Sequence, residues 1–173
     1  MKPPYMQLHK FVSKNHFKIV GAILLMAIGQ LGNAQQSHPE YSVVMQVVEN
    51  FFDSINTGDG ELIASLEVEG AHILNIREDI AGKYEFVERD WFGADNFGDD
   101  NKLTERYWDE QLLLSDNLAV FWAQYDFHIN GEFSHCGTDV LNLIKIEGAW
   151  KIGHAMWTIQ RPGCEESPLG PLH

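Results

Sequence analysis

Two side chains near the carboxyl end of the chain are of types that could transfer a proton. His154 and Asn142 lie in two neighbouring runs of alternating apolar residues, which the turn Glu147-Gly148-Ala149 joins. Counting outward from a three-residue hairpin turn sets Asn142 directly opposite His154. An imidazole accepts or donates a proton near neutral pH, and an amide can orient it. The alternative is a buried histidine that simply hydrogen-bonds Asn142.

A carboxylate and two aromatic rings are expected near this pair. Counting from the turn Asp116-Asn117 places Trp108 and Glu110 on the same sheet face as Tyr125. Glu110 is a candidate partner for the imidazole, or it forms an ion pair with Arg106. The two aromatic rings could hold a flat ligand, or they could be ordinary core residues.

Helices come first in the chain, and strands follow. Apolar residues recur every three or four positions from Tyr41 to Ile55, which predicts a helix after the capping-box pattern Ser37-His38-Pro39-Glu40. Gly58 would end this helix, and Asp59 would begin a shorter one. Further strands are expected at 71–77 and 84–88, the second of which could instead be helical. Four long strands are then predicted: Thr104–Leu114, Leu118–Ile129, Phe133–Ile146 and Trp150–Arg161.

The hairpin registers assign side chains to the two faces of this sheet. The face expected beneath the helices carries Trp108, Leu112, Phe121, Tyr125, Phe127, Val140, Ile144, Trp150, Ile152 and Met156, with Arg106, Glu110, Asn142 and His154 among them. The opposite face carries Trp122, Gln124, Asp126, His128, His135, Asp139, Leu141 and Trp157. A mixed aromatic and polar face without helices over it suits a homodimer interface. One β-bulge would exchange the two faces downstream of it.

Composition limits the partners of the chain. It has 173 residues, with 12 Lys plus Arg against 25 Asp plus Glu, and a formal charge of −13. This charge argues against nucleic acid and against anionic membranes, both of which require a basic surface. The length and the 45% hydrophobic content suit one folded domain.

The first 34 residues resemble a secretory signal peptide. Four lysines precede the apolar run Ile19–Ile28, and Gly32-Asn33-Ala34 resembles a cleavage site. A membrane anchor is the alternative, but the run is shorter than the roughly 20 residues that span a bilayer. We therefore expect a periplasmic or secreted protein with one domain at 35–163, a tail at 164–173 and a charge of −17, from 8 basic and 25 acidic residues.

Export affects the interpretation of the two cysteines. In an oxidising compartment Cys136 and Cys164 could form a disulfide, and two free thiols are the alternative. Neither cysteine lies near clustered histidines, so no zinc site is expected. The acidic run at Asp95, Asp99 and Asp100 lacks the ligand pattern of an EF-hand and is interpreted as a loop.

Two motifs carry a family resemblance. Asn56-Thr57-Gly58-Asp59 follows the first helix, and Gly148-Ala149-Trp150-Lys151-Ile152, followed by His154, lies at the end of the last hairpin. With the order of elements, they resemble the NTF2-like superfamily (SnoaL-like proteins) over about residues 39 to 161. The resemblance implies an α+β fold in which two to three helices and a strongly curved antiparallel sheet form a cone that holds a ligand. Members include enzymes and non-catalytic assembly domains, so the fold alone leaves the chemistry open.

The resemblance also allows one known mechanism to be tested. In the ketosteroid isomerase branch a tyrosine of the first helix and an aspartate of the first strand do the chemistry. These positions align with Phe51 and Asn75, which lack the necessary donor and base. That mechanism is therefore not expected here.

Two functions follow as hypotheses. The first is an exported domain that binds a small, partly apolar organic ligand, with or without acid–base catalysis of a lyase, isomerase or hydrolase type, and without cofactor or metal. The second is a non-catalytic dimeric module that works through its outer sheet face. The expected catalytic residues are His154, Asn142 and Glu110, and the expected ligand-binding residues are Tyr125, Trp108, Arg106, Phe51, Asn75 and Met156.

Overall fold

The structure is a computed structural model that describes residues 36–79, 81–90 and 101–172. The chain separates into two compact units, Met1–Ser37 and His38–His173, and the second contains the β-sheet. None of the helices in the described ranges is long and apolar enough to cross a membrane.

Two sequence-based expectations lie outside the described residues. These are the signal peptide at 1–34 and the loop at the acidic run Asp95, Asp99 and Asp100.

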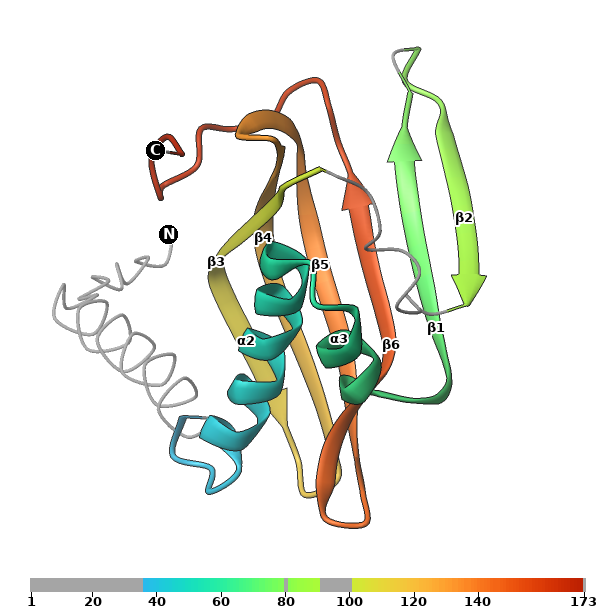
Figure 1. Cartoon of the computed structure of the whole chain (residues 1–173), viewed down its shortest axis with the longest axis vertical. Helices are drawn as coiled ribbons and strands as arrows, with labels where there is room; N and C mark the ends of the chain where they lie inside the picture. The colour runs from blue at the N-terminus through green and yellow to red at the C-terminus, as the bar shows by residue number, and fades with distance from the viewer. Residues whose placement is uncertain (1–35, 80, 91–100, 173) are drawn as a thin grey trace, which may run out of the picture. The chain divides into compact units, whose positions relative to one another are not determined.

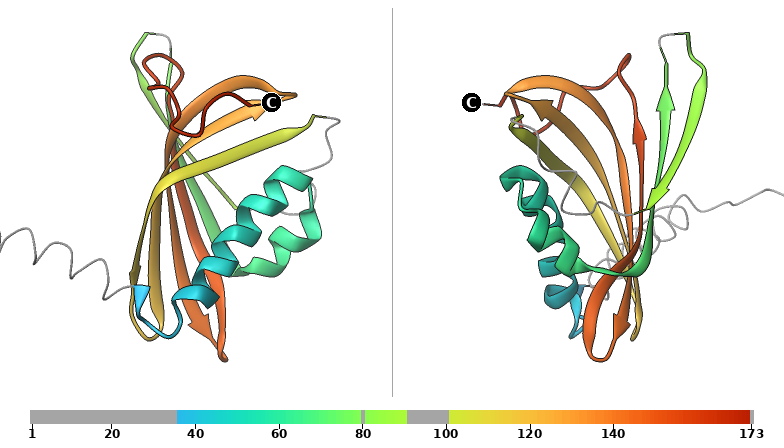
Figure 2. Two further views of the ribbon diagram at one scale, coloured as in Figure 1. Left: turned by 90° about the vertical axis from the view of Figure 1, so that its left-hand side faces the viewer. Right: turned by 45° about the vertical axis from the view of Figure 1, so that its right-hand side comes forward.

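Over its described residues, the second unit is an α+β domain in which two helices pack on a six-stranded sheet. Figure 1 labels its elements, which are α2 (Tyr41–Thr57), α3 (Gly60–Leu66), β1 (Glu67–Glu78), β2 (Tyr84–Asp90), β3 (Leu103–Leu114), β4 (Leu118–Ile129), β5 (Glu132–Ile146) and β6 (Ala149–Ile159). The strand order is β2-β1-β6-β5-β4-β3, and only β1 and β6 run parallel. The sheet curves around the helices, which lie on its concave side (Figure 2). The predicted fold class is thus confirmed.

Helix α2 presents an apolar stripe to the sheet, as predicted. Its buried residues include Val44, Val48, Phe51, Phe52 and Ile55, which recur with the three- and four-residue spacing of one helix face. The helix ends at Gly58, whose φ of 69° is the left-handed conformation that glycine adopts without strain. The Asp59 side chain accepts from the Leu62 backbone N–H and caps α3, also as predicted.

The start of α2 differs from the predicted capping box. The N-cap residue is Glu40, and its side chain makes no capping hydrogen bond. The Glu40 carboxylate instead accepts from Lys145 Nζ and Trp150 Nε1, both at 2.8 Å. Tertiary contacts of a carboxylate with a cation and an indole therefore replace the local cap and fix the helix start against β5 and β6.

Three β-bulges lie in the antiparallel pairs β3–β4, β4–β5 and β5–β6. On β3, Asp109 and Glu110 both face Ala123 of β4, and Asp109 has a φ of 54°. On β5, Ser134 is the extra residue between the pairs Phe127–His135 and His128–Phe133. On β6, Gly153 is the extra residue between Leu143–Ile152 and Asn142–His154. Bulges increase twist and bend strands, which explains how this sheet curves around the helices.

The bulge at Ser134 overturns the predicted faces of β5. Asp139, Leu141 and Leu143 are buried against the helices, whereas the alternate residues Val140 and Asn142 are only half-buried. A single extra residue exchanges the two faces because side chains alternate along a strand. The predicted two-residue turn at Asn130-Gly131 is correct, but the register beyond the bulge is shifted by one residue.

On β6, two differences from the prediction cancel. The turn contains two residues, Glu147 and Gly148, instead of the predicted three. The bulge at Gly153 then adds one residue to β6 and restores the predicted register beyond it. Asn142 consequently pairs with His154 as predicted, although the predicted turn length is wrong.

Candidate functional site

The predicted pair Asn142 and His154 exists, but it lies on the convex face of the sheet. Asn142 Nδ2 is 3.3 Å from His154 Nδ1. Their neighbours in sequence, Leu141, Leu143 and Ala155, fill the core, so the pair points away from the helices. The expectation that these side chains enter the cone is wrong. The Ser134 bulge exchanges the two faces of β5, so Asn142 points outward, and His154 points outward with it because the two residues are paired. The catalytic role predicted for His154 depended on this placement and has no support from the geometry.

Several other predicted site residues also lie outside the cone. Met156 pairs with Val140, and Trp108 with Gln124, both on the convex face. Glu110 is exposed in the β3 bulge and does not accompany the imidazole. The register counted from the Asp116-Asn117 turn fails at this bulge, where β3 gains one residue.

Arg106 is also on the convex face, where it holds the carboxyl-terminal tail. Its guanidinium makes a two-point ion pair with the Asp126 carboxylate, with Nε–Oδ1 at 2.9 Å. Arg106 Nη1 also donates to the Gly170 carbonyl at 3.0 Å. The expected pairing of Arg106 with Glu110 is therefore wrong.

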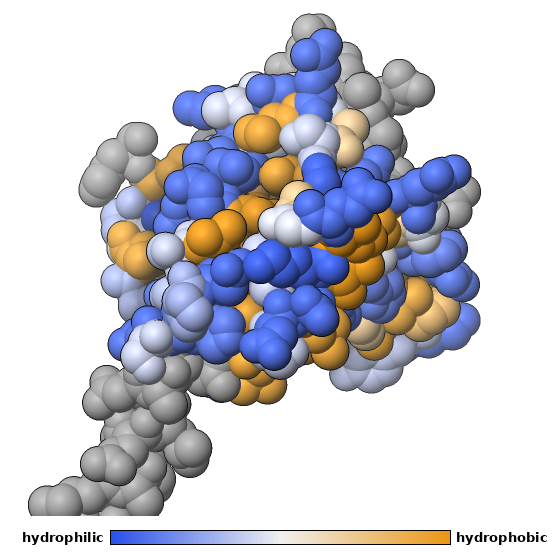
Figure 3. Space-filling model, turned by 90° about the horizontal axis from the view of Figure 1, so that it is seen from below, coloured by the Kyte–Doolittle hydropathy of each residue, from blue (hydrophilic) through white to orange (hydrophobic). Residues whose placement is uncertain are grey.

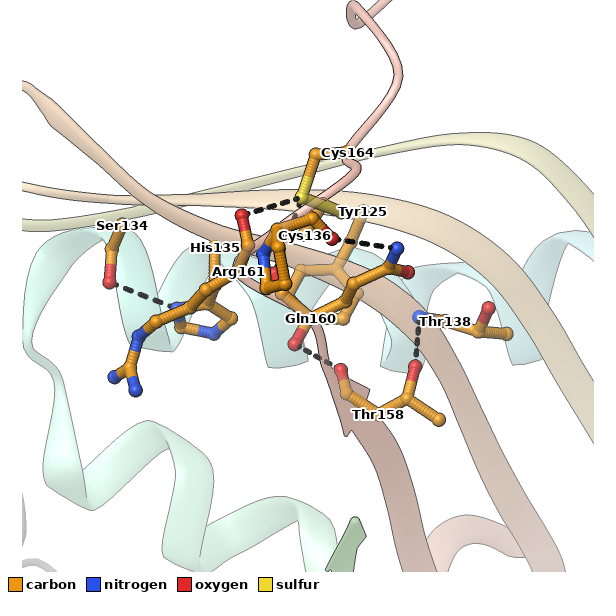
Figure 4. Close-up of a disulfide and its surroundings, with 10 residues drawn as sticks. Tyr125, Ser134, His135, Cys136, Thr138, Thr158, Gln160, Arg161 and Cys164 are labelled. Carbon is orange, nitrogen blue, oxygen red and sulfur yellow. Dashed lines mark hydrogen bonds between the residues drawn. A yellow bond between two sulfur atoms is a disulfide. The ribbon is translucent and has the colours of Figure 1, made fainter. Parts of the chain in front are cut away.

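Three predicted residues do lie on the core side: Phe51, Tyr125 and Asn75. Phe51 packs edge-on against Phe52 within the core. Tyr125 is 1% exposed, and Asn75 is fully buried. The Tyr125 hydroxyl donates to the Thr158 carbonyl at 2.7 Å, so this group is already engaged (Figure 4).

Two acidic residues that the sequence analysis did not select are buried on this face. Glu105 is 8% exposed and Asp139 is 4% exposed, and their carboxyl groups hydrogen-bond each other. Burial raises the pKa of Glu105 to about 7 and raises the pKa of Asp139 well above its usual range. Two adjacent buried carboxyl groups cannot both ionise at low cost, so they share a proton.

The backbone of Glu105 is fixed by an asparagine of helix α2. Asn56 Nδ2 donates to the Glu105 carbonyl at 3.1 Å, and the Glu105 N–H donates to Asn56 Oδ1 at 2.6 Å. Because β3 is an edge strand, the Asn56 amide takes the place that a further strand would occupy. This contact gives a structural reason for the first residue of the motif Asn56-Thr57-Gly58-Asp59.

Gly137 allows the strands around Tyr125 to approach closely. A Cβ atom at Gly137 would lie 1.9 Å from the Thr158 carbonyl oxygen and 2.7 Å from Tyr125 Cε1. Only glycine fits between β4 and β6 at this point, beside the bond from Tyr125 to Thr158.

A histidine lies beside Tyr125. The His135 ring stacks on Phe127 with centroids 4.8 Å apart and meets Tyr125 edge-on at 5.7 Å. Ser134 Oγ is 3.0 Å from His135 Nδ1 (Figure 4). Burial lowers the pKa of His135 to about 4, helped by the charges of Arg161 and Arg77. His135 is therefore a neutral imidazole at physiological pH, on the core side where the sequence analysis did not place it.

Asn75 is held by its oxygen and not by its nitrogen. Asn75 Oδ1 accepts from Arg77 Nε at 3.1 Å. Asn75 Nδ2 and Asp139 Oδ2 are buried and have no hydrogen-bond partner among the described residues.

A cleft of about 320 Å³ opens between α2 and β3. Its lining consists of Glu49, Phe52, Asp53, Asn56, Glu105, Arg106 and Tyr107. This volume is at the lower end of the range for small-molecule sites, which begins at about 300 Å³. Glu105 belongs both to the cleft lining and to the carboxyl pair, and it links the opening to the buried polar groups.

The predicted disulfide is present. Cys136 of β5 is bonded to Cys164, which anchors the tail beyond β6 (Figure 4). The same segment forms a bridge between Cys136 and Gln160. Within the described part of the chain, no group of three His, Cys, Asp or Glu side chains is placed to hold a metal ion.

The sequence contained a weak signal for the carboxyl pair. Asp139 directly precedes the mostly apolar segment Val140–Ile146, and Glu105 lies in a strand beside Arg106. The exchange of faces that one β-bulge upstream would cause places Asp139 inside. Nothing local indicated that the bulge lies at Ser134, because bulges depend on pairing between strands.

Comparisons with known proteins identify the fold. No protein-family model matches the sequence, and no curated protein matches it. An NTF2-like superfamily protein from Salmonella enterica serovar Typhimurium has a TM-score of 0.51 at 16% identity, covering 73% of this chain and 95% of the other.

Two further solved structures from Novosphingobium aromaticivorans are similar. A candidate scytalone dehydratase has a TM-score of 0.53 at 11% identity, covering 77% of this chain and 93% of the other. The beta subunit of a candidate aromatic-ring-hydroxylating dioxygenase has a TM-score of 0.53 at 10% identity, covering 76% and 95%. At such low sequence identities, the similarity to these structures shows the fold alone. The helix-and-curved-sheet architecture and these neighbours together confirm the predicted resemblance: this chain has the NTF2-like fold.

Proposed function

We propose that the domain binds a small, partly apolar organic molecule on the concave side of its sheet and transfers a proton to or from it. The observation that carries this proposal is the buried pair Glu105 and Asp139, whose carboxyl groups hydrogen-bond each other. Such a pair retains a proton near neutral pH and can act as acid or base. The fold likeness to a candidate scytalone dehydratase supports a small organic substrate.

The proposed chemistry is acid–base catalysis of a lyase, isomerase or hydrolase type that needs no cofactor. Glu105 lines the cleft beside α2 and would exchange the proton with the ligand. Asp139 would hold the proton while Glu105 is ionised. Tyr125 is a positioning residue, because its hydroxyl is engaged by Thr158 and its ring abuts Gly137.

The experiment compares the wild-type domain with Glu105→Gln and Glu110→Gln. Native mass spectrometry would detect co-purified ligands, and thermal shift with a small-molecule library would supply further candidates. Glu105→Gln should weaken binding of a cone ligand and reduce any turnover by about 10²- to 10⁴-fold. Glu110→Gln makes the same chemical change at an exposed position of the same strand and should leave both unchanged. Equal behaviour of the two variants would refute the proposed site.

A second function, a dimeric binding or assembly module, is supported by the convex face. Trp122, Val140, Met156 and Leu74 form a row across four strands, on the face without helices. Around the nearby turns, the exposed side chains Leu113, Leu118 and Ile146 add apolar surface, and Figure 3 shows hydrophobic bands between hydrophilic side chains at this end. We propose that this face pairs with a second copy.

The residues of this proposed interface differ partly from the prediction. Trp122, Gln124, Asp126 and His128 lie on the convex face as expected. Asp139, Leu141 and Trp157 belong to the concave face, and His135 does too, because of the Ser134 bulge. A substitution at Trp157 would therefore not test the dimer.

We also propose that the protein is exported. The proposal is supported by the basic and apolar order of residues 1–34 and by a disulfide between the only two cysteines. Disulfides persist in oxidising compartments.

A further inference from the structure

The cleft between α2 and β3 has a negatively charged opening. Glu49 and Asp53 line it from α2, where they lie one turn apart, and both are exposed. Glu105 lines the same cleft and is 8% exposed, so it lies at the inner end. In the described part of the chain, neither Glu49 nor Asp53 takes part in an ion pair. Like charges at this helical spacing repel each other, and the fold itself does not relieve the repulsion.

The arginine in the cleft lining does not offset these charges. The Arg106 guanidinium bonds the Asp126 carboxylate and the Gly170 carbonyl on the convex face of the sheet. Its charge is therefore matched by Asp126, on the other side of β3 from the cleft. The opening thus keeps an excess of negative charge.

The phenol of Tyr107 reports on this negative charge from inside the cleft. Burial raises the pKa of Tyr107, and the charges of Glu49, Glu110 and Asp53 raise it further. A carboxylate disfavours ionisation of a phenol only when it lies close by. The two carboxylates of α2 therefore lie near the Tyr107 side chain.

Two aromatic rings supply an apolar wall beside the carboxylates. The centroids of Phe52 and Tyr107, which both line the cleft, are 4.5 Å apart with the rings tilted by 31°. Tyr107 also meets Phe121 edge-on, with centroids 5.5 Å apart. Contacts on two sides hold the Tyr107 ring in a fixed position. A ring next to carboxylates can bind both the apolar part and the charge of an organic cation.

These features define the charge and the size of the ligand. The cleft of about 320 Å³ accommodates a small molecule, and its opening attracts cations and repels anions. We propose that the cleft binds a protonated amine with one apolar ring, whose ammonium group pairs with Glu49 and Asp53 and whose ring packs on Tyr107. This inference rests on the proposed function, because it assigns the ligand class of the site that Glu105 lines.

Three probes of similar size test the charge by isothermal titration calorimetry on the full chain. Benzylamine is a cation at neutral pH, benzyl alcohol is uncharged and benzoate is an anion. Benzylamine should bind most tightly and benzoate least tightly. Glu49→Gln and Asp53→Asn should each weaken benzylamine binding about two- to fivefold and leave benzyl alcohol unchanged. Added salt should weaken benzylamine binding and leave benzyl alcohol unchanged.

Glu61→Gln separates the cleft from the net charge of the protein. The chain carries a formal charge of −13, so any cation is attracted to it in general. Glu61 is an exposed residue of α3 that does not line this cleft. Its substitution changes the net charge by the same amount and should leave benzylamine binding at the wild-type level. All three substituted side chains are exposed, so the variants should fold, and urea titration would verify this.

Several outcomes overturn the inference. Benzyl alcohol that binds as tightly as benzylamine would do so, as would no benzylamine binding at millimolar concentration. An equal loss in Glu61→Gln and the two cleft variants would reduce the effect to net charge. Benzylamine binding that depends on Glu105 but not on Glu49 or Asp53 would overturn the ligand charge and leave the proposed function standing. If Glu105→Gln alters the binding of none of the probes, the proposed function itself is refuted, and a dependence on Glu49 and Asp53 would still support a cation site.

Discussion

At the scale of single residues, the central feature is a carboxyl pair that only burial makes reactive. Glu105 is one of 25 acidic residues, and its type alone does not distinguish it. Loss of water on burial raises the pKa of Glu105 most, the hydrogen bond to Asp139 lowers it, the nearby charge of Asp126 raises it, and the resulting pKa is about 7. Asp126 and Asp139 belong to β4 and β5, so their effects could not be inferred from the residues around position 105.

The stability of the domain should fall with rising pH because of this pair. The pKa of Glu105 is raised from 4.5 to about 7, so the folded state holds a proton that the unfolded state releases. Its stabilisation is complete below about pH 4.5 and is lost as pH rises to about 7, by roughly 3 kcal/mol. Glu105→Gln cannot ionise, so its free energy of unfolding, from urea titrations, should decline less over this range.

Glu110→Gln is the control for this pH dependence. Its side chain is exposed, so its curve should run parallel to that of the wild type. A decline of equal size in all three proteins would show that Glu105 is not the group responsible.

At the scale of the strands, the bulges decide which side chains face the helices. Asn142 and His154 pair as expected, yet they face outward because Ser134 adds one residue to β5. Helix α2 was predicted correctly because its apolar spacing is local. Strand faces depend on pairing partners, and a one-residue slip reverses them.

Gly137→Ala should strongly destabilise the domain. The new Cβ atom would lie 1.9 Å from the Thr158 carbonyl oxygen, so β5 and β6 would have to separate beside Tyr125. We expect a loss of about 3 kcal/mol or more in the free energy of unfolding, measured by urea titration. Gly153→Ala is the matched control, since its nearest neighbours would be 3.8 Å away, and it should cost less than about 1 kcal/mol. Similar losses for both variants would contradict the close approach at Gly137.

Removing the disulfide should also lower stability. Cys136 and Cys164 are 28 residues apart, and closing a loop of that length stabilises by about 3–4 kcal/mol in the chain-entropy description. The double variant Cys136→Ala, Cys164→Ala should unfold at a correspondingly lower urea concentration. Dithiothreitol should destabilise the wild type and leave the variant unchanged. An identical midpoint for oxidised and reduced wild type would argue against a stabilising bridge.

At the scale of the whole domain, the two sheet faces serve different purposes. The concave face holds the core and the buried polar groups under α2 and α3, and the tail is fixed on the convex face by Arg106 and Gly170. The remaining convex surface carries the apolar row of Trp122, Val140 and Met156. Apolar side chains grouped on the face without helices are typical of an interaction surface.

The proposed dimer predicts the effect of a charge in the apolar row. Val140→Glu places a carboxylate between Trp122 and Met156, which should dissociate the dimer in sedimentation equilibrium. Val43→Glu on α2, where the wild-type valine is 49% exposed, should leave the assembly unchanged. A wild-type domain that sediments as a monomer would disprove the proposed interface.

The proposed export predicts a processed amino terminus. Mass spectrometry of protein from the periplasm or medium should find a chain that begins at Gln35 and lacks 34 residues. Leu24→Arg interrupts the apolar run Ile19–Ile28 and should leave the unprocessed precursor in the cytoplasm. Recovery of the wild-type chain with residues 1–34 attached would count against the signal peptide.

Local sequence was enough to predict the helices, most hairpin turns, the disulfide partners and the similarity of the fold to NTF2-like proteins. These features follow from the spacing of apolar residues, from turn residues such as Asn130-Gly131, and from the presence of only two cysteines. The meeting of Glu105 and Asp139 under the helices, and the outward position of His154, became visible only in the folded domain. Each bulge adds a residue where two strands fail to match, and such a mismatch exists only once both strands are paired.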